Sequence, residues 1–247
     1  NATRINKWPN TRYNNRSKNI KVGRVKTKEK NKEIEKEVRR QKVEDNEINV
    51  IKNRKNLALK LGYNYEDLVY MNQIHSANII VVDENSPKLV DNCDSIITRS
   101  KNLPLMVMVA DCIPILMFDD KQGIIAAIHA GRNSTFLEIS KKTAEVFIEK
   151  FSSNPEDINA VFGASIQKCC YEVSDELSKI VENSFGKEFV ENNYIDLQGI
   201  NKKQLNDLGI KNIEISNICT KCGDKSYFSY RKDKKTGRFA GIIILKD

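Results

Sequence analysis

The chain has 247 residues, with 41 Lys and Arg, 33 Asp and Glu and two His, which gives a formal net charge of +8. This length can bury a core without disulfide staples, which excludes the class of small disulfide-built domains. No apolar run is long enough to cross a bilayer and no secretion signal is visible, so we expect a cytoplasmic protein with no membrane partner and six free cysteines.

The basic excess lies at the N-terminal end. Residues 1–45 hold 15 of the Lys and Arg but only 6 of the Asp and Glu, a local net charge of +9, and the remainder carries −1. Few apolar residues recur periodically here, which predicts a loosely packed extension over 1–44 and a single domain over 45–247. A polyanion-binding arm is the alternative. No groove-reading motif accompanies the charge, so no nucleic-acid partner is expected.

A helix is predicted over residues 48–62, capped by Asp45 or Asn46 and ended by Gly62. Its apolar side would comprise Ile48, Ile51, Leu57 and either Leu59 or Leu61. Residues 67–82 look strand-like and contain His75, and a short strand is expected within 92–98.

The most informative stretch is residues 103–138. It reads as a strand ending at Ala110, a second strand over 114–118 and a third apolar run ending at His129. Cys112 lies between the first two strands. Both Cys112 and His129 are therefore expected at strand ends, where a rigid scaffold presents side chains to a cleft.

After His129 the pattern changes to a helical one over residues 136–151, with Thr135 and Glu138 placed as a capping box. A helix start this close to His129 would offer backbone N–H groups to phosphate or to a developing anion.

The C-terminal half is predicted to contain a strand over 158–166, helices over 174–185 and 198–208, a strand over 210–216 and a final buried strand. Its four cysteines could supply a second structural zinc site, which we regard as minor because adjacent cysteines seldom coordinate one ion comfortably. These are Cys169, Cys170, Cys219 and Cys222.

His75, Cys112 and His129 have the chemistry of zinc ligands, and three protein ligands leave a fourth position open for water or substrate. Their spacing is too long for a local metal motif. On residue type alone, two core histidines and an inert buried thiol remain the alternative.

Several segments together resemble the bacterial laccase-domain family, also called the polyphenol oxidase, purine nucleoside phosphorylase or peptidoglycan editing factor family. The segments are NRKNLALKLG at 53–62, NQIHS at 72–76, CDSIIT at 93–98, VADCIPILMFD at 109–119, AIHAG at 127–131, CCYEV at 169–173, and CT followed by FSYRKD and TGR. The match covers residues 45–247 in order and in spacing.

The resemblance implies an α+β fold, a layered sandwich of mixed β-sheets flanked by helices, similar to the cytotoxic necrotizing factor catalytic domain. It also implies zinc, or copper as a substitute, on His75, Cys112 and His129, and phosphorolysis of adenosine, inosine or methylthioadenosine together with adenosine deamination. The partners would be a purine nucleoside and phosphate. Catalytic roles would fall to Cys112, His129 and Asp111, and substrate would be bound by Gln73, Arg132, Ser134, Thr135, Tyr171, Tyr230 and Arg231.

Chemistry ranks the activities linked to this family. A single metal with an open position suits deamination or phosphorolysis, whereas multicopper oxidation of phenols needs more histidines than the two present. Cys112 as a nucleophile paired with His129 would instead suit an amidase acting on a peptidoglycan precursor.

Two departures from the family leave open a metal-binding protein without turnover. The family usually continues Trp-Arg-Gly-Thr after AIHAG, where residues 132–135 here read Arg-Asn-Ser-Thr, and its Gly-rich N-terminal segment is not recognisable in 1–44.

Overall fold

The computed structural model describes residues 20–27, 47–223 and 227–247. Five α-helices occur in this part of the chain: α2 (Glu47–Leu61), α3 (Arg132–Phe136), α4 (Ile139–Phe151), α5 (Asp175–Ser184) and α6 (Leu197–Asp207). Among the described residues, no helix combines the length and the apolarity needed to cross a bilayer.

The larger of two mixed sheets has six strands in the order β12-β9-β7-β8-β5-β3. Its bounds are β12 (Asn212–Ile215), β9 (Asn159–Phe162), β7 (Ile113–Asp119), β8 (Ile124–Ala130), β5 (Ser95–Thr98) and β3 (Ile79–Val81). The antiparallel pair β7 and β8 forms its centre, as the run of short apolar segments predicted, and every side chain of both strands is buried.

The second sheet has five strands in the order β1-β13-β6-β2-β4. Its bounds are β1 (Ile20–Thr27), β13 (Arg238–Leu245), β6 (Leu105–Val109), β2 (Val69–Met71) and β4 (Leu89–Val90). A small antiparallel pair, β10 (Val190–Glu191) and β11 (Tyr194–Ile195), forms a further sheet, and there are 3-10 turns at Tyr65–Asp67 and Lys187–Phe189.

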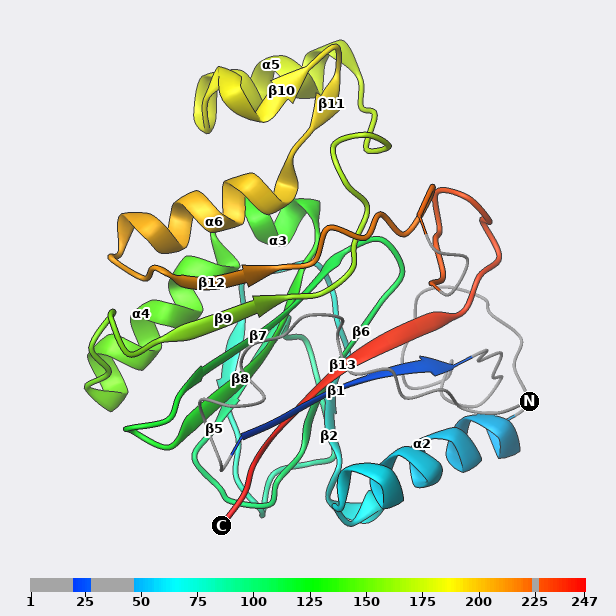
Figure 1. The fold of residues 1–247 in the computed structure, drawn as a ribbon, viewed down its shortest axis with the longest axis vertical. Coiled ribbons are helices and arrows are strands. Elements are labelled where there is room, and N and C mark those ends of the chain that lie inside the picture. The colour runs from blue at the N-terminus through cyan, green and yellow to red at the C-terminus, as the bar shows by residue number, and fades with distance from the viewer. Residues whose placement is uncertain (1–19, 28–46, 224–226) are drawn as a thin grey trace.

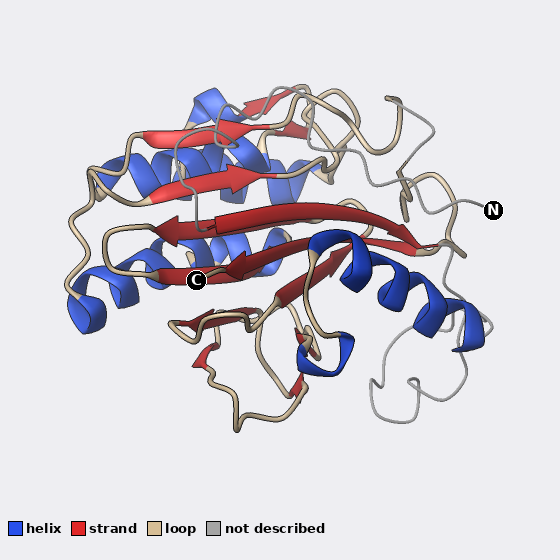
Figure 2. Ribbon diagram, turned by 60° about the horizontal axis from the view of Figure 1, so that its bottom comes forward, coloured by secondary structure: helices blue, strands red, loops and turns tan. Residues whose placement is uncertain are grey.

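The two main sheets pack against each other, and helices cover their outer faces (Figures 1 and 2). Period-two alternation divides each strand between two cores. On β7, Ile115 and Met117 pack towards α4 and α6, whereas Leu116 and Phe118 join the core between the sheets. The expected sandwich of mixed sheets flanked by helices is confirmed at this level.

The helix α2 covers the five-stranded sheet alone, at the lower right of Figure 1. Leu57 and Ala58 bury the helix against Met106 and Ile242. The prediction left the apolar side open between Leu59 and Leu61, and Leu59 proves 81% exposed while Leu61 packs against the core. The caps expected of Asp45 or Asn46 lie outside the described residues.

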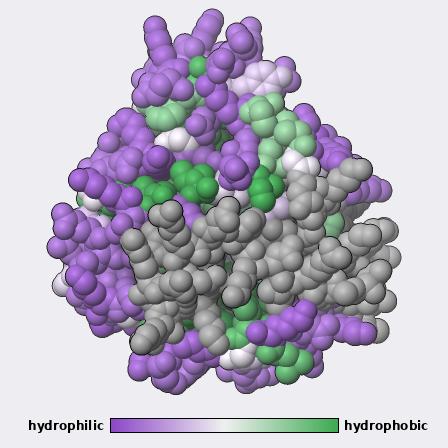
Figure 3. Space-filling view, in the orientation of Figure 1, coloured by the Kyte–Doolittle hydropathy of each residue, from purple (hydrophilic) through white to green (hydrophobic). Residues whose placement is uncertain are grey.

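Hydrophilic residues dominate the surface in Figure 3, most clearly over α5 at the top of the view, and hydrophobic residues show in small patches. Large apolar side chains are therefore mostly buried, in agreement with a core that the chain can build without staples.

The prediction of a loosely packed extension is wrong for residues 20–27. They form β1, which pairs antiparallel with β13 over its whole length, from Ile20 opposite Leu245 to Thr27 opposite Arg238. Apolar and β-branched residues of IKVGRVKT favour a strand, and pairing with a buried partner outweighs the local excess of charge. The rest of the predicted extension lies outside the described residues.

The predicted capping box is also wrong. Two helices replace the single one, and Thr135 lies inside the first of them, where its hydroxyl accepts a hydrogen bond from Asn201. Glu138 adopts a left-handed conformation (φ 61°) between α3 and α4, and its side chain makes no cap hydrogen bond. Tertiary contacts with α6 thus override the local capping signal.

Candidate metal centre

Three different elements carry the two histidines and Cys112. His129 is the penultimate residue of β8, and the alternation of that strand turns it to the same side as Ala127, towards the space between the two sheets. Cys112 lies immediately before β7, at a strand end as predicted. His75 was expected on a strand, but it lies in the loop between β2 and β3 with a left-handed backbone (φ 60°).

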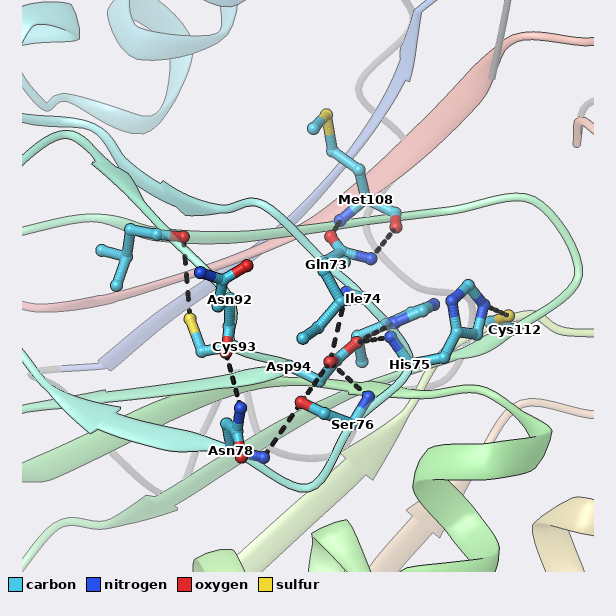
Figure 4. Close-up of polar contacts among 12 residues, drawn as sticks. Gln73, Ile74, His75, Ser76, Asn78, Asn92, Cys93, Asp94, Met108 and Cys112 are labelled. Carbon is cyan, nitrogen blue, oxygen red and sulfur yellow. Dashed lines mark hydrogen bonds and ion pairs between the residues drawn. The ribbon is translucent and has the colours of Figure 1, made fainter. Parts of the chain in front are cut away.

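The three side chains converge. One ligand atom from each residue lies within 4.8 Å of the other two. The Cys112 Sγ is 3.8 Å from His75 Nε2, and the two imidazole centroids are 4.7 Å apart at an interplanar angle of 76°. Figure 4 shows the Cys112 and His75 side chains pointing towards each other. His129 is buried, whereas His75 is exposed, so a small molecule can reach the group from the His75 side.

Asp94 was not among the predicted site residues, but it holds His129 and the His75 loop in place. Its carboxylate is fully buried and accepts a hydrogen bond from His129 Nδ1 (2.8 Å). It also accepts backbone N–H groups of Ile74, His75 and Ser76 and the Ser76 hydroxyl, a fan of contacts visible in Figure 4. A carboxylate behind a histidine fixes the tautomer that leaves Nε2 for a metal.

The thiol and His129 influence each other strongly. Burial alone would raise the pKa of Cys112, but the neighbouring His129 and His75 lower it to about 6. Burial likewise opposes protonation of His129, yet Cys112 and Asp94 raise its pKa to about 9. The site therefore favours a thiolate at neutral pH, and the thiolate is the form of cysteine that binds metals and acts as a nucleophile.

Gly131 leaves the space that the His75 and Cys112 side chains occupy. A Cβ atom added there would lie 2.7 Å from His75 Cδ2 and 3.1 Å from Cys112 Sγ. The backbone of Gly131 is extended (φ −76°), so the constraint is space and not conformation. Any other residue would push at least one of the two side chains aside.

We therefore expect Gly131→Ala to lower the affinity for the metal roughly tenfold or more, by displacing His75 or Cys112. Competition with a chromogenic zinc chelator measures the change. Gly241→Ala is the matched control, because its Cβ would meet its neighbours at 3.4 Å or more, in ordinary contact. Equal zinc affinity in the two variants would contradict the crowding at Gly131.

Asp111, predicted to be catalytic, accepts hydrogen bonds from two other residues of the protein. Its carboxylate accepts the Thr220 hydroxyl (2.6 Å) and the backbone N–H of Arg231 (2.7 Å), and its backbone is left-handed (φ 88°). The residue thus ties Thr220 and Arg231 to the start of β7, directly beside Cys112.

Gln73, predicted to bind substrate, has both ends of its amide occupied by one backbone residue. Its Nε2 donates to Met108 O (2.8 Å) and its Oε1 accepts from Met108 N (3.0 Å). These bonds attach the His75 loop to β6, as Figure 4 shows.

Ser134 and Thr135, predicted to contact phosphate, are fully buried. The Thr135 hydroxyl accepts a hydrogen bond from Asn201 of α6, and the Ser134 hydroxyl is buried with no hydrogen-bond partner among the described residues. Because α3 is a single short turn packed on α6, its hydroxyl side chains face the interior. The structure does not bring these two side chains to an open anion site.

Tyr171, Arg231 and Arg132 lie close to one another, and the Tyr171 ring lies near Cys112. The Arg231 guanidinium stacks over the Tyr171 ring, 4.8 Å from its centroid, and donates to Glu172 O (2.8 Å). Burial raises the pKa of Tyr171, while Arg132 and Arg231 oppose that rise, so both cations lie near this ring. Arg132 is exposed at the start of α3.

Tyr230 is exposed, with Lys234 over its ring. Arg238 was not among the predicted substrate residues. It is partly buried and lies close enough to Cys112 and Asp111 to be influenced by their charges. Burial lowers the pKa of Arg238. The TGR segment of the resemblance was the signal that could have identified it.

The donor set fits a catalytic type of metal centre. Two imidazole nitrogens and one thiolate are ligands that zinc prefers, and a three-residue set leaves a position open. The hydrogen bond from His129 to the Asp94 carboxylate has the form expected behind a metal-binding histidine.

Comparisons with known proteins identify the family of the chain. Residues 37–246 match the family model described as multi-copper polyphenol oxidoreductase laccase. A Campylobacter jejuni protein named purine nucleoside phosphorylase is 36% identical over 208 residues, which cover 82% of this chain and 90% of that protein. A Corynebacterium glutamicum protein of the same name is 35% identical over 202 residues, covering 79% and 81% respectively.

Solved structures share the fold. The Bacillus licheniformis hypothetical protein YfiH superposes with a TM-score of 0.81 at 29% identity, covering 92% of this chain and 93% of its own. YlmD from Geobacillus stearothermophilus gives the same TM-score at 25% identity, covering 93% of each chain.

Proposed function

Because the chain belongs to the multi-copper polyphenol oxidoreductase laccase family, with relatives named purine nucleoside phosphorylase, we propose that it is a zinc-dependent purine nucleoside phosphorylase. The observation that carries the proposal is the convergence of His75, Cys112 and His129, backed by Asp94 and open on the His75 side. Adenosine, inosine and methylthioadenosine are the proposed nucleosides.

Zinc is the proposed metal because imidazole and thiolate donors suit it, with copper as a substitute. When bound, zinc would supply a Lewis acid able to orient phosphate or polarise the substrate. The family name notwithstanding, phenol oxidation at several copper ions is not proposed, since the whole chain has two histidines.

In phosphorolysis, a phosphate oxygen bonds to C1′ of the ribose while the C1′–N9 bond breaks and its electron pair leaves with the purine. The substrate anion needs cations that are near the metal group but are not ligands. Arg231, Arg132 and Arg238 meet that requirement, and the planar guanidinium of Arg231 is already oriented by Tyr171. Asp111 positions Arg231 through its backbone N–H.

Adenosine deamination is proposed as a second activity of the same site. It requires water, not phosphate, at the reacting carbon, and it releases ammonia from C6 of the purine. A metal centre with three protein ligands and an open position serves both reactions, because each places a nucleophile beside an electrophilic carbon.

The test is product formation from adenosine by the zinc-loaded protein, with and without phosphate. We expect adenine and ribose 1-phosphate only when phosphate is present, and inosine with ammonia in either case, separated by chromatography. Adenine release that is unaffected by phosphate would rule out phosphorolysis.

Arg231→Lys should weaken phosphate binding and raise the KM for phosphate about tenfold, because lysine loses the planar bidentate geometry.

One observation favours a second candidate, an amidase acting on a peptidoglycan precursor. The pKa of Cys112 is lowered to about 6 beside His129, as in a thiolate nucleophile paired with a histidine. Cleavage of a serine-containing precursor by metal-free protein, abolished by a thiol alkylating agent, would support this reading. If the zinc-loaded protein turned over neither substrate, metal binding would be the one proposed role that remained.

A further inference from the structure

Four cysteines that the proposed reaction does not use form a second cluster. Their sulfur atoms all lie within 4.8 Å of one another, and the Cys169 and Cys222 sulfurs are 3.6 Å apart. Cys170 and Cys219 are buried, whereas Cys169 and Cys222 are exposed. The cluster therefore lies at the surface, with two of its ligand atoms anchored in the protein.

Two turns far apart in sequence bring these sulfurs together. The first turn is closed by the Cys170 N–H, which donates to Gln167 O (2.9 Å). It allows the adjacent cysteines at 169 and 170 to face one cluster, which was not expected from their sequence. A backbone bridge between Ser165 and Cys219 holds the two segments side by side.

The second turn has the form of a metal-binding knuckle. The Gly223 N–H donates to Cys219 O (2.9 Å), and a Cβ at position 223 would lie 2.4 Å from that oxygen, so only glycine fits. The turn thus carries Cys219 and Cys222 into the same cluster.

The spacing suits a tetrahedral ion. Zinc bound to four sulfurs at 2.3 Å would separate those sulfurs by about 3.8 Å, close to the distance between Cys169 and Cys222. A disulfide would need about 2.05 Å between the same two atoms. A site of four thiolates has no open position, which is the mark of a structural site and not of a catalytic one.

We propose that Cys169, Cys170, Cys219 and Cys222 bind a structural zinc ion, separate from the His75, Cys112 and His129 centre. The ion joins the segment that carries Tyr171 to the segment that carries Thr220. Thr220, next to Cys219 in the chain, donates to Asp111 beside Cys112, and Asp111 also accepts the backbone N–H of Arg231. The second ion thus fixes the loop of Tyr171 and supports the carboxylate that positions Arg231.

Metal analysis of the full chain, purified with a reducing agent and loaded with zinc, tests the proposal. We expect about two zinc ions per chain in the wild-type protein and about one in Cys222→Ser. His75→Ala should also retain about one, and this variant leaves all four cysteines intact. Cys93→Ser is the matched control, since Cys93 is buried near Val90 and outside both groups, and it should retain about two.

Cobalt substitution identifies the remaining ligands without relying on activity. Cobalt-loaded His75→Ala should show the intense thiolate-to-cobalt absorption of a tetrahedral four-sulfur site, and Cys222→Ser should lose most of it. If Cys222→Ser fails to fold, the spectrum of cobalt-loaded His75→Ala is sufficient by itself to test for the four-sulfur site. Loss of phosphorolysis in His75→Ala with this spectrum retained separates the two sites.

Any of four results would overturn the proposal. The first is a wild-type zinc content in Cys222→Ser, and the second is a His75→Ala protein that holds no metal. The third is a disulfide between Cys169 and Cys222 in the reduced preparation, found by peptide mapping. Iron in place of zinc would overturn the assignment of the ion.

Discussion

Replacing Cys112 by serine is expected to remove zinc from the His75, Cys112 and His129 centre and to lower phosphorolysis of adenosine by more than about 100-fold. Loss of contacts behind a metal ligand already costs roughly 10–100-fold, and loss of the ligand itself should cost more. Serine has nearly the size of cysteine, but its hydroxyl stays protonated at neutral pH and is a poor zinc ligand. Zinc content and kcat/KM measured on one preparation check the result.

Cys93→Ser is the control for thiol loss, because the Cys93 thiol donates to Val90 O and does not reach the centre. It should change the free energy of unfolding but leave the zinc content at the wild-type value. If Cys112→Ser kept wild-type zinc content and activity, the thiolate would have no part in the centre. If it kept zinc but lost activity, the nucleophilic role of Cys112 would gain support.

The second large effect is expected from Asp94→Asn. Asparagine keeps the shape of the side chain but places an N–H₂ group among donors that already point at it. His129 Nδ1 and the backbone N–H groups of His75 and Ser76 cannot all be satisfied by the one remaining oxygen. We expect zinc affinity to fall 10–100-fold, roughly, and the free energy of unfolding to fall by about 1–3 kcal/mol.

Zinc competition titration and urea unfolding measure the two effects of Asp94→Asn. Burial opposes ionisation of Asp94, yet hydrogen bonds from His129 and Ser76 lower its pKa below the usual value. Its stabilising contribution should therefore be present above the ordinary carboxyl pKa and be lost as pH falls through the lowered value. A variant that unfolds with the same dependence on acid pH as the wild type would contradict this role.

Asp119→Ala separates stability from metal binding. Asp119 is also fully buried, but it lies at the far end of β7, roughly 20 Å along the strand from Cys112. Its Oδ1 accepts backbone N–H groups of Lys121 and Gln122. Alanine leaves these two N–H groups without their acceptor, so this variant should lose stability with zinc affinity unchanged. A matching loss of affinity would show that the effect of Asp94→Asn is only structural.

Local sequence pattern was enough to predict the centre of the fold. The apolar runs of residues 105–130 are separated by Asp111 and by the turn before Ile124, and they form β6, β7 and β8. Such strands are specified by residues that are neighbours in the chain. The same was true of α5, where Ser174 accepts the N–H of Leu177 as a cap, and of the helix end at Gly209 (φ +85°).

Long-range contacts decided where those predictions failed. The strand β1 forms because β13 offers it a partner more than 200 residues away in the chain, which no local window detects. Thr135 and Glu138 have the spacing of a capping box, but Asn201 of α6 binds the threonine hydroxyl and the helix is split. His75 leaves the strand pattern because Asp94 binds three consecutive backbone N–H groups there.

The sequence by itself determined the chemistry available to this protein: two imidazoles, one thiol between buried strands, and four further cysteines in its C-terminal half. Only the tertiary structure decided which of these groups meet. Strand pairing of β8 with β5 and β7 carries His129 to Asp94 and Cys112, and two turns joined across the chain gather the four cysteines. Residue type determines which metal ligands the chain has. The distances between those ligands depend on strand and turn pairings between segments far apart in the chain. The free energy of such a pairing depends on both partners, so neither segment predicts it alone.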